Sequence, residues 1–286
     1  MRKYIFSLTW ILLFLLTTSC GMQKKSLVAD VMTFNIRLDV PSDSLNSWQH
    51  RKDNVAGMIR YYEPDIIGMQ EVLHSQLIDL TERLPRYTAV GVGRADGKMA
   101  GEYCSLFFKT DHFELLKEGN FSLCETPLKF GAKGWDAAYE RMATWAVLKD
   151  KATGQKFICI NTHLDNEGKL ARKEGLKLVL AKAKELGGGL PVIVMGDFND
   201  TAESESIRIM DHSGMKNTRG AAAVVYGPSW SFHDFGRLNM AERPLIDHIY
   251  VSTPIDVNKY RVVNDTPEYG YLSDHNPVLV NITIKK

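Results

Sequence analysis

The sequence predicts an α/β sandwich built on mixed β-sheets. Segments typical of strands outnumber segments typical of helices, and the long helical segments each lie between strands. Residues 191–195 are apolar throughout, as in a short strand that is buried on both faces. Residues 27–286 contain neither a linker-like segment nor a short repeat, so we expect one domain there.

The first half of the chain alternates strands with helices and then becomes rich in strands. Residues 27–35 are largely apolar and β-branched, which predicts a strand. Apolar residues at helical spacing follow Ser47, an expected N-cap, and Pro64 ends this helix because proline cannot continue one. We expect a strand at 65–70, a helix at 74–84, and strands at 87–92, 103–109, 113–123, 143–148 and 156–161.

The second half begins with a long helix at residues 167–186. Leu176, Val179, Leu180 and Ala183 give this helix an apolar stripe. The glycines at 187–189 end it, where a left-handed residue is needed. The remaining strands are expected at 191–195, 245–251, 257–263 and 277–284.

The N-terminus has the layout of a secretory signal. Arg2 and Lys3 precede the apolar residues 5–16, and small residues follow up to Cys20. Such a stretch rises only about 18 Å as a helix, whereas a bilayer core is about 30 Å thick, so a membrane-spanning anchor is the less favoured alternative.

Cys20 resembles the cleavage site of a bacterial lipoprotein, although Thr17 stands where such sites usually have leucine. We therefore expect residues 1–19 to be a signal peptide and residues 20–26 to be a tether lipidated at Cys20. The protein would then be exported and anchored to a bacterial envelope membrane, facing the periplasm or the cell surface, by its lipid alone. An ordinary soluble secreted protein is the alternative.

The charge of the chain excludes a general basic surface for nucleic acid. The sequence has 35 Lys and Arg against 34 Asp and Glu. Removal of residues 1–19 takes away Arg2 and Lys3 and no acid, which leaves 33 against 34 and a net charge of −1.

The cysteines do not form a metal-binding pattern. No CxxC pair is present, which argues against a structural zinc site. Cys104 and Cys159 lie inside apolar, strand-like runs, so we expect both to be buried free thiols.

Acids, amides and histidines gather at six places beside apolar strands. They are Asn35; Gln70 and Glu71; Asn161, His163 and Asp165; Asp197 and Asn199; Asp247 and His248; and Ser273, Asp274 and His275. One such residue alone is typical of a turn bonded to its own backbone, or of a core histidine. Their joint occurrence favours a site, because α/β proteins build sites at strand ends.

These residue types favour metal-dependent acid–base chemistry. The carboxylates of Glu71, Asp197 and Asp274, with the amides of Asn35 and Asn199, are hard oxygen ligands that suit Mg²⁺ or Mn²⁺. Histidines beside carboxylates offer a general acid and a general base near neutral pH.

Six segments, in order, resemble the endonuclease/exonuclease/phosphatase superfamily of Mg²⁺-dependent phosphoesterases. The resemblance covers residues 28–284 and implies a four-layer α/β sandwich, in which two packed mixed β-sheets are flanked by helices and the site lies at one end of the sheets. The segments are Thr33–Arg37, Met69–Val72, Asn161–Asp165, Gly196–Asn199, Ile246–Ile249 and Ser273–Pro277.

The resemblance implies a role for each matching residue. Glu71 would be the principal metal ligand, with Asn35 beside it, and Asp274 would hold the metal directly or through water. His275, oriented by Asp247, would act as the general base or contact the scissile phosphate.

Four further residues would complete this chemistry by the same resemblance. Asp197 and Asn199 would place the attacking water and a phosphate oxygen. His163 would contact the phosphate or protonate the leaving group. Glu102 would hold His163, by similarity to the nuclease branch, or would be a surface acid at a strand start.

Three residues are candidates for substrate recognition. Arg94 lies in a turn-rich loop, residues 91–102, that either rims the site or forms a solvated hairpin. Arg141 either clamps a phosphate with its planar guanidinium or forms a surface ion pair. Trp230 opens an aromatic segment, residues 230–235, that either stacks on a base or sugar or packs as a small cluster.

The sequence thus predicts a divalent-metal-dependent hydrolase of phosphoric esters that acts as a monomer. A small phosphorylated molecule, such as a sugar or inositol phosphate, is the favoured substrate, because the chain lacks both the apolar insertion of a sphingomyelinase and the positive charge of a nuclease. A secreted nuclease is the first alternative. A non-catalytic binding lipoprotein of the same fold is the second, because fold does not imply function.

Overall fold

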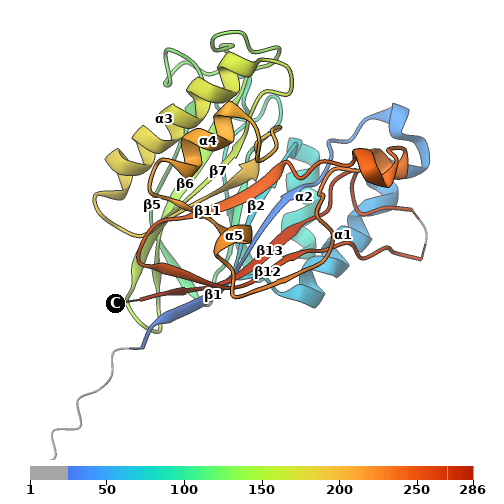
Figure 1. The fold of residues 1–286 in the computed structure, drawn as a ribbon. Helices are drawn as coiled ribbons and strands as arrows, with labels where there is room; N and C mark the ends of the chain where they lie inside the picture. The colour runs from blue at the N-terminus through green and yellow to red at the C-terminus, as the bar shows by residue number, and fades with distance from the viewer. Residues whose placement is uncertain (1–24, 269, 286) are drawn as a thin grey trace, which may run out of the picture.

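Two β-sheets pack face to face, and helices cover the outer face of each (Figure 1). This computed structural model describes residues 25–268 and 270–285. The predicted signal peptide and Cys20 lie outside the described residues. Within the described part of the chain, no helix is both long and apolar enough to cross a membrane.

The first sheet has seven strands and carries both ends of the domain. Its first strand pairs parallel with its second and antiparallel with the last strand of the chain, so the sheet is mixed. The strands, in spatial order, are β10 (Val224–Tyr226), β12 (Ile255–Val262), β13 (Val278–Ile284), β1 (Leu27–Asn35), β2 (Ile66–Gln70), β4 (Leu106–Lys109) and β3 (Tyr87–Val90).

The second sheet has six strands and is also mixed. Strands β7 and β8 are parallel, and β11 runs antiparallel to β8. The strands, in spatial order, are β5 (Phe113–Ser122), β6 (Met142–Asp150), β7 (Lys156–His163), β8 (Val192–Asp197), β11 (Asp247–Val251) and β9 (Lys216–Asn217).

Helices form the two outer layers. Helices α1 (Trp48–Tyr62) and α2 (His74–Arg83) pack on the seven-stranded sheet, and α3 (Lys169–Gly187) and α4 (Glu205–Asp211) pack on the six-stranded sheet. Figure 1 shows these pairs on opposite sides of the molecule. The short elements are α5 (Thr218–Ala221) and the 3-10 turns η1 (Pro41–Asn46), η2 (Asp234–Gly236) and η3 (Met240–Glu242).

Alternation along each strand divides the core into three layers. In β1, Val31 points to the layer between the sheets, whereas Met32 and Phe34 pack under α1 and α2. In β7, Cys159 faces the layer between the sheets and Ile160 faces α3. Each large apolar side chain buried in this way contributes about 1.5–3 kcal/mol to stability.

The predicted four-layer sandwich and its mixed sheets are confirmed. Strand β4 begins at Leu106 rather than at 103, because Tyr103 forms only an isolated bridge with Val72. Gly188 ends α3 in the left-handed conformation, as expected. Helices α4 and α5, the short strands β9 and β10, and the 3-10 turns were not predicted. Cys104 and Cys159 are buried free thiols, as is Cys124.

The topology brings the polar strand ends to one edge of the sandwich. Asp247, at the amino end of β11, pairs with Asp197 at the carboxyl end of β8. Val278, at the amino end of β13, likewise pairs with Thr33 near the carboxyl end of β1. Because β1, β2, β7 and β8 all end on this edge, side chains that are far apart in the sequence meet there.

A buried amide ties the two sheets together beneath this edge. The Asn161 side chain, on β7, donates to the carbonyls of Met69 (2.8 Å) and Ser105 (2.9 Å) and accepts from Gln70 (2.6 Å). Gly68 makes the approach possible, because a Cβ there would lie 2.8 Å from the Asn161 amide. The spacing between the sheets at the edge is thereby fixed.

Candidate active site

A polar cleft of about 480 Å³ opens at the shared edge of the sheets. It collects most of the residues that the sequence singled out, from both sheets and from the segment before β13. The lining residues are Arg37, Leu38, Glu71, Arg94, Glu102, Tyr139, Arg141, His163, Asn166, Asp197, Asn199, Phe232, Asp234, Asp274 and His275. Asn35 and Asp247 lie just beneath this surface, in hydrogen-bond contact with lining residues.

Asn35 links the two sheets at the floor of the cleft. Its amide nitrogen donates to Glu71 Oε1 and to Asp197 Oδ2, both at 2.9 Å. Its amide oxygen accepts the backbone N–H of Arg37 at 3.0 Å. Both ends of the amide are therefore engaged within the protein, and Asn35 positions two carboxylates while its oxygen keeps one lone pair.

Asp247 and His275 form the ion pair predicted between them. Asp247 Oδ2 lies 2.8 Å from His275 Nδ1, and both side chains are buried. Burial lowers the pKa of His275, but the charges of Asp247 and Asp197 outweigh it and raise that pKa to about 10. The ring therefore carries a proton at neutral pH.

Asp197 lies at the centre of the site. Its Oδ2 is 3.5 Å from His163 Nε2 and 3.7 Å from His275 Nε2. Burial and the neighbouring charge of Asp247 raise the pKa of Asp197 to about 7. A carboxylate with this pKa can gain or lose a proton near neutral pH, as a general base requires.

His163 is a neutral, buried histidine that Asn199 holds in place. The Asn199 amide nitrogen lies 3.0 Å from His163 Nε2 and donates to the carbonyl of Leu164 at 3.0 Å. Burial and two nearby arginines keep the pKa of His163 well below its ordinary value. Its Nδ1 has no hydrogen-bond partner and is 3.9 Å from Glu102 Oε2, beyond hydrogen-bond reach. Glu102 therefore lies beside this ring, as the resemblance implied, but without a direct hydrogen bond to it.

Glu71 and Asp274 present carboxylates to one side of the cleft. Glu71 Oε2 accepts the backbone N–H of Leu38 at 3.1 Å, and Asp274 Oδ1 accepts from Ser273 at 3.2 Å. Burial raises the pKa of Asp274, and the charge of Glu71 raises it further. Two carboxylates that line one side of a cleft, with oxygen as the donor atom, fit a hard divalent cation.

Asp197, Asp247 and His275 also place three ligand atoms within 4.8 Å of one another. In this cluster His275 is protonated and paired with Asp247 at 2.8 Å, so its ring offers no lone pair to a metal ion. The Glu71–Asp274 side is therefore the better place for a metal ion.

Three neighbouring side chains form one wall of the cleft. Arg94 pairs with Glu102 at 2.7 Å, and Arg141 bonds Asn166 at 2.8 Å. The ring of Tyr139 lies between the two guanidinium groups, with centroid distances of 5.9 and 5.6 Å. Tyr139 is 46% exposed, whereas Arg141 is buried and also pairs with Asp165 at 3.3 Å, so the wall offers a partly exposed ring and guanidinium groups that already have carboxylate partners.

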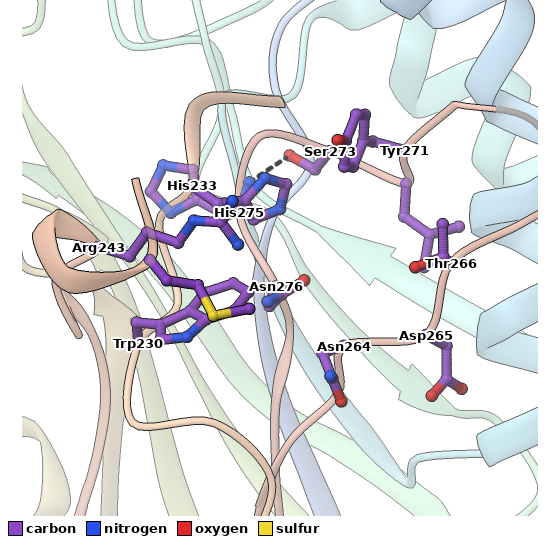
Figure 2. Close-up of a pocket in the computed structure, with 12 residues that line it drawn as sticks. Trp230, His233, Arg243, Asn264, Asp265, Thr266, Tyr271, Ser273, His275 and Asn276 are labelled. Carbon is purple, nitrogen blue, oxygen red and sulfur yellow. Dashed lines mark hydrogen bonds between the residues drawn. The ribbon is translucent and has the colours of Figure 1, made fainter. Parts of the chain in front are cut away.

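Trp230 lies outside this cleft, in contrast to the prediction. It lines a second cavity of about 220 Å³, which shares His275 with the cleft (Figure 2). Arg243 covers its ring, with the guanidinium 4.5 Å from the centroid. The side chain of this segment that lines the polar cleft is Phe232, whose ring lies 4.9 Å from that of His275. Trp230 and Phe232 thus line different cavities, although side chains two residues apart share one face of a regular strand.

Several lining residues were not singled out from the sequence. Arg37 lies just after strand β1, but an arginine at such a position is usually a surface residue.

Arg37, Glu71 and Asn199 have positive φ angles of 58°, 60° and 49°, which residues other than glycine rarely adopt. Such strain costs on the order of 1–3 kcal/mol at each position and is typical of functional sites.

Comparisons with known proteins agree with this geometry. A model of the endonuclease/exonuclease/phosphatase family matches residues 32–275. A protein of that description from Bacteroides vulgatus is 44% identical in sequence. The match covers 91% of this chain and 100% of that protein, with a TM-score of 0.88. A mannosyl-6-phosphatase from Bacteroides thetaiotaomicron is 38% identical. This match covers 89% of this chain and 99% of that protein, with a TM-score of 0.85.

Curated relatives are more distant and longer. The Candida albicans CCR4-Not complex 3'-5'-exoribonuclease subunit Ccr4 is 24% identical over 302 residues, which cover 84% of this chain and 38% of that protein. The alignments span between 18% and 48% of the length of such relatives.

Proposed function

This chain belongs to the endonuclease/exonuclease/phosphatase family, and on that basis we propose that it hydrolyses the phosphate ester of a small phosphorylated molecule, with a sugar phosphate as the favoured class. One observation carries the proposal. A single cleft holds an aspartate with a pKa near neutrality, a protonated histidine, a neutral histidine and a carboxylate pair suited to a cation.

Each of these groups has a role in the proposed hydrolysis. Asp197 accepts a proton from the attacking water, because its pKa of about 7 matches the working pH. The protonated His275, held by Asp247, places positive charge beside Asp197 and the phosphate. His163 is neutral and its Nε2 accepts from the Asn199 amide, so it orients Asn199 rather than supplying a full proton.

A divalent metal completes the proposed site. Glu71 and Asp274 would hold it, Asn35 would orient Glu71, and Mg²⁺ or Mn²⁺ fits their oxygen atoms. When bound, such an ion neutralises phosphate charge and stabilises the leaving oxygen.

The wall formed by Arg94, Tyr139 and Arg141 favours a small sugar phosphate. Its exposed ring can pack on an apolar sugar face while its guanidinium groups bond phosphate or hydroxyl oxygens. The similar mannosyl-6-phosphatase supports a phosphomonoester substrate. A nuclease is the second candidate, supported by similarity to the Ccr4 exoribonuclease subunit.

A substrate panel tests this proposal. Phosphate release would be measured with Mg²⁺ from hexose 6-phosphates, inositol phosphates and p-nitrophenyl phosphate, alongside cleavage of single-stranded RNA and DNA. We expect sugar phosphates to be the best substrates. Tyr139→Ala should raise KM for them and leave KM for p-nitrophenyl phosphate unchanged. Cleavage confined to oligonucleotides, with strong salt dependence, would favour the nuclease.

We also propose that the protein is exported and lipid-anchored at Cys20, from the layout of residues 1–20. Mass spectrometry of the N-terminal peptide tests this, because a diacylated Cys20 is expected and an unmodified peptide would contradict it.

A further inference from the structure

Arg51 is a buried cation on the first turn of α1. It is only 2% exposed, and burial lowers the pKa of its guanidinium to about 10, so the group still carries its proton at neutral pH. Its four hydrogen bonds to the described residues all go to backbone carbonyls, and none goes to a carboxylate. Because a buried charge is costly unless its donors are satisfied, these carbonyls are what keep the guanidinium in place.

The four hydrogen bonds join three segments that are far apart in the sequence. Arg51 Nη1 donates to the carbonyls of Ile36 at 2.6 Å and Leu272 at 2.8 Å. Its Nη2 donates to the carbonyl of Arg37 at 3.1 Å, and its Nε donates to that of Asn46 at 2.6 Å. The turn after β1, the end of η1 and the segment before β13 therefore meet on one planar group, whose donors point in fixed directions.

The two carbonyls that share Nη1 stand next to residues of the site. Ile36 directly follows Asn35, whose amide holds the Glu71 carboxylate at 2.9 Å. Leu272 stands two residues before Asp274. One nitrogen of the guanidinium thus links the segment that holds one carboxylate suited to a cation to the segment that carries the other.

Two further contacts reinforce this link. The Ser273 hydroxyl donates to the carbonyl of Asn35 at 2.7 Å, so the same two segments are joined a second time. The ring centroids of Trp48 and Phe235 lie 5.5 and 5.8 Å from the guanidinium carbon of Arg51, within the range at which aromatic rings attract a cation. Because Phe235 belongs to η2, this turn is also held against α1.

We propose that Arg51 is a positioning residue of the active site, which sets the spacing between the end of β1 and the segment that carries Asp274 and His275. Arg51 is not among the residues that line the catalytic cleft, so it acts through the backbone of its neighbours. The inference rests on the proposed function, because this spacing matters for Glu71 and Asp274 as the holders of a metal ion. A lysine could supply the charge but not the rigid fork of donors.

Two variants with a matched control test this role. Arg51→Met removes every donor of the side chain, and Arg51→Lys keeps the charge without the fork. Val55→Ala is the control, because Val55 is fully buried one turn further along the same helix. Isothermal titration calorimetry would measure Mn²⁺ binding to the metal-free protein, and steady-state kinetics would give kcat and KM for p-nitrophenyl phosphate with Mg²⁺. Urea unfolding would show that each variant is folded and how much stability it has lost.

We expect Arg51→Met to bind Mn²⁺ at least about tenfold more weakly than the wild type and to lose at least about tenfold in kcat, with little change in KM. Arg51→Lys should show part of both losses although it keeps the charge. Val55→Ala should lose stability but keep the Mn²⁺ affinity and kcat of the wild type. The contrast with this control separates positioning of the site from a merely structural role.

Other outcomes overturn the inference. Wild-type Mn²⁺ affinity and kcat in Arg51→Met would do so, as would tighter Mn²⁺ binding, which would show that only the charge of Arg51 reaches the site. If Arg51→Met does not fold, wild-type values in Arg51→Lys would overturn the inference instead. Weaker Mn²⁺ binding in the variants, with no phosphate release by the wild type, would leave it standing and refute the proposed function. No Mn²⁺ binding to the wild type would refute both.

Discussion

The Asp247→Asn substitution changes the charge at the buried histidine while keeping the size of its partner. Asp247 Oδ2 and His275 Nδ1 are 2.8 Å apart, and both side chains are at most 6% exposed. Solvent therefore screens this pair little, and the effect of the substitution can be worked from the structure.

The expected magnitude follows from the pKa of His275. A rise from 6.5 to about 10 corresponds to about 5 kcal/mol in favour of the protonated ring. Two unit charges about 4 Å apart at an effective dielectric constant of about 20 interact by about 4 kcal/mol, which is most of that amount. Without the Asp247 charge, burial should lower the pKa of His275 to near or below 7.

The sign of the pH dependence follows from the same values. The folded pKa of His275 exceeds its unfolded value, so the pair stabilises the fold fully below pH 6.5 and progressively less as the pH rises toward 10. Asp197 titrates in a lower range, between its ordinary 3.8 and about 7. The effect of Asp197 on stability is therefore largely separate from that of His275 above pH 7.

Urea unfolding at several pH values between 7 and 10, with chelator present, measures this effect. The wild type should lose a few kcal/mol of unfolding free energy across the range, and Asp247→Asn should lose much less. Titration of the His275 ring by NMR gives the pKa directly. Parallel stability curves for the two proteins, with an unchanged His275 pKa, would refute the reasoning.

Three further changes have defined outcomes. Glu71→Gln should lower metal-dependent phosphate release by at least about 100-fold and weaken Mn²⁺ binding, measured by steady-state kinetics and calorimetry. Cys104 and Cys159 should resist thiol reagents in the folded protein, because burial raises the pKa of both thiols, and that of Cys104 to about 12. Rapid labelling of the folded protein would contradict this. Phe107→Ala should destabilise the fold by about 3–5 kcal/mol in urea unfolding, because Phe107 is fully buried under α1 and α2.

The strand ends explain why much of the site could be predicted from the sequence. Asn35, Glu71 and Asp197 each follow a strand whose apolar pattern is clear, and parallel strands end on the same edge. Asp247 and Asp274 were placed with them by resemblance, and the structure shows why they meet there: Asp247 begins β11 and Asp274 precedes β13, and both strands run antiparallel to their neighbours.

The features of the site that could not be predicted depend on contacts between residues that no local sequence pattern encodes. Trp230 and Phe232 are close in the sequence, yet only the structure decides that Phe232 faces the cleft. Glu102 was assigned to His163 by resemblance, and the structure adds that its carboxylate bonds Arg94 at 2.7 Å while lying 3.9 Å from His163 Nδ1. Arg37 was not singled out from the sequence, because its guanidinium is held by Asp43. Asp43 lies in a 3-10 turn that was not predicted.

The short elements were missed for a related reason. Helix α4 spans only Glu205–Asp211, too few residues for a clear helical period, and packing against α3 stabilises it. Strand β10 has exposed apolar residues and forms by pairing with β12, a long-range contact.

Phosphate release from a hexose 6-phosphate, with Mg²⁺ and with chelator, tests most directly whether this cleft is a metal-dependent phosphoesterase site. The wild type should release phosphate only with the metal, and His275→Ala, shown to be folded by circular dichroism, should lose at least about 100-fold in rate. Release that persists in chelator, or that survives intact in His275→Ala, would contradict the assignment of the cleft.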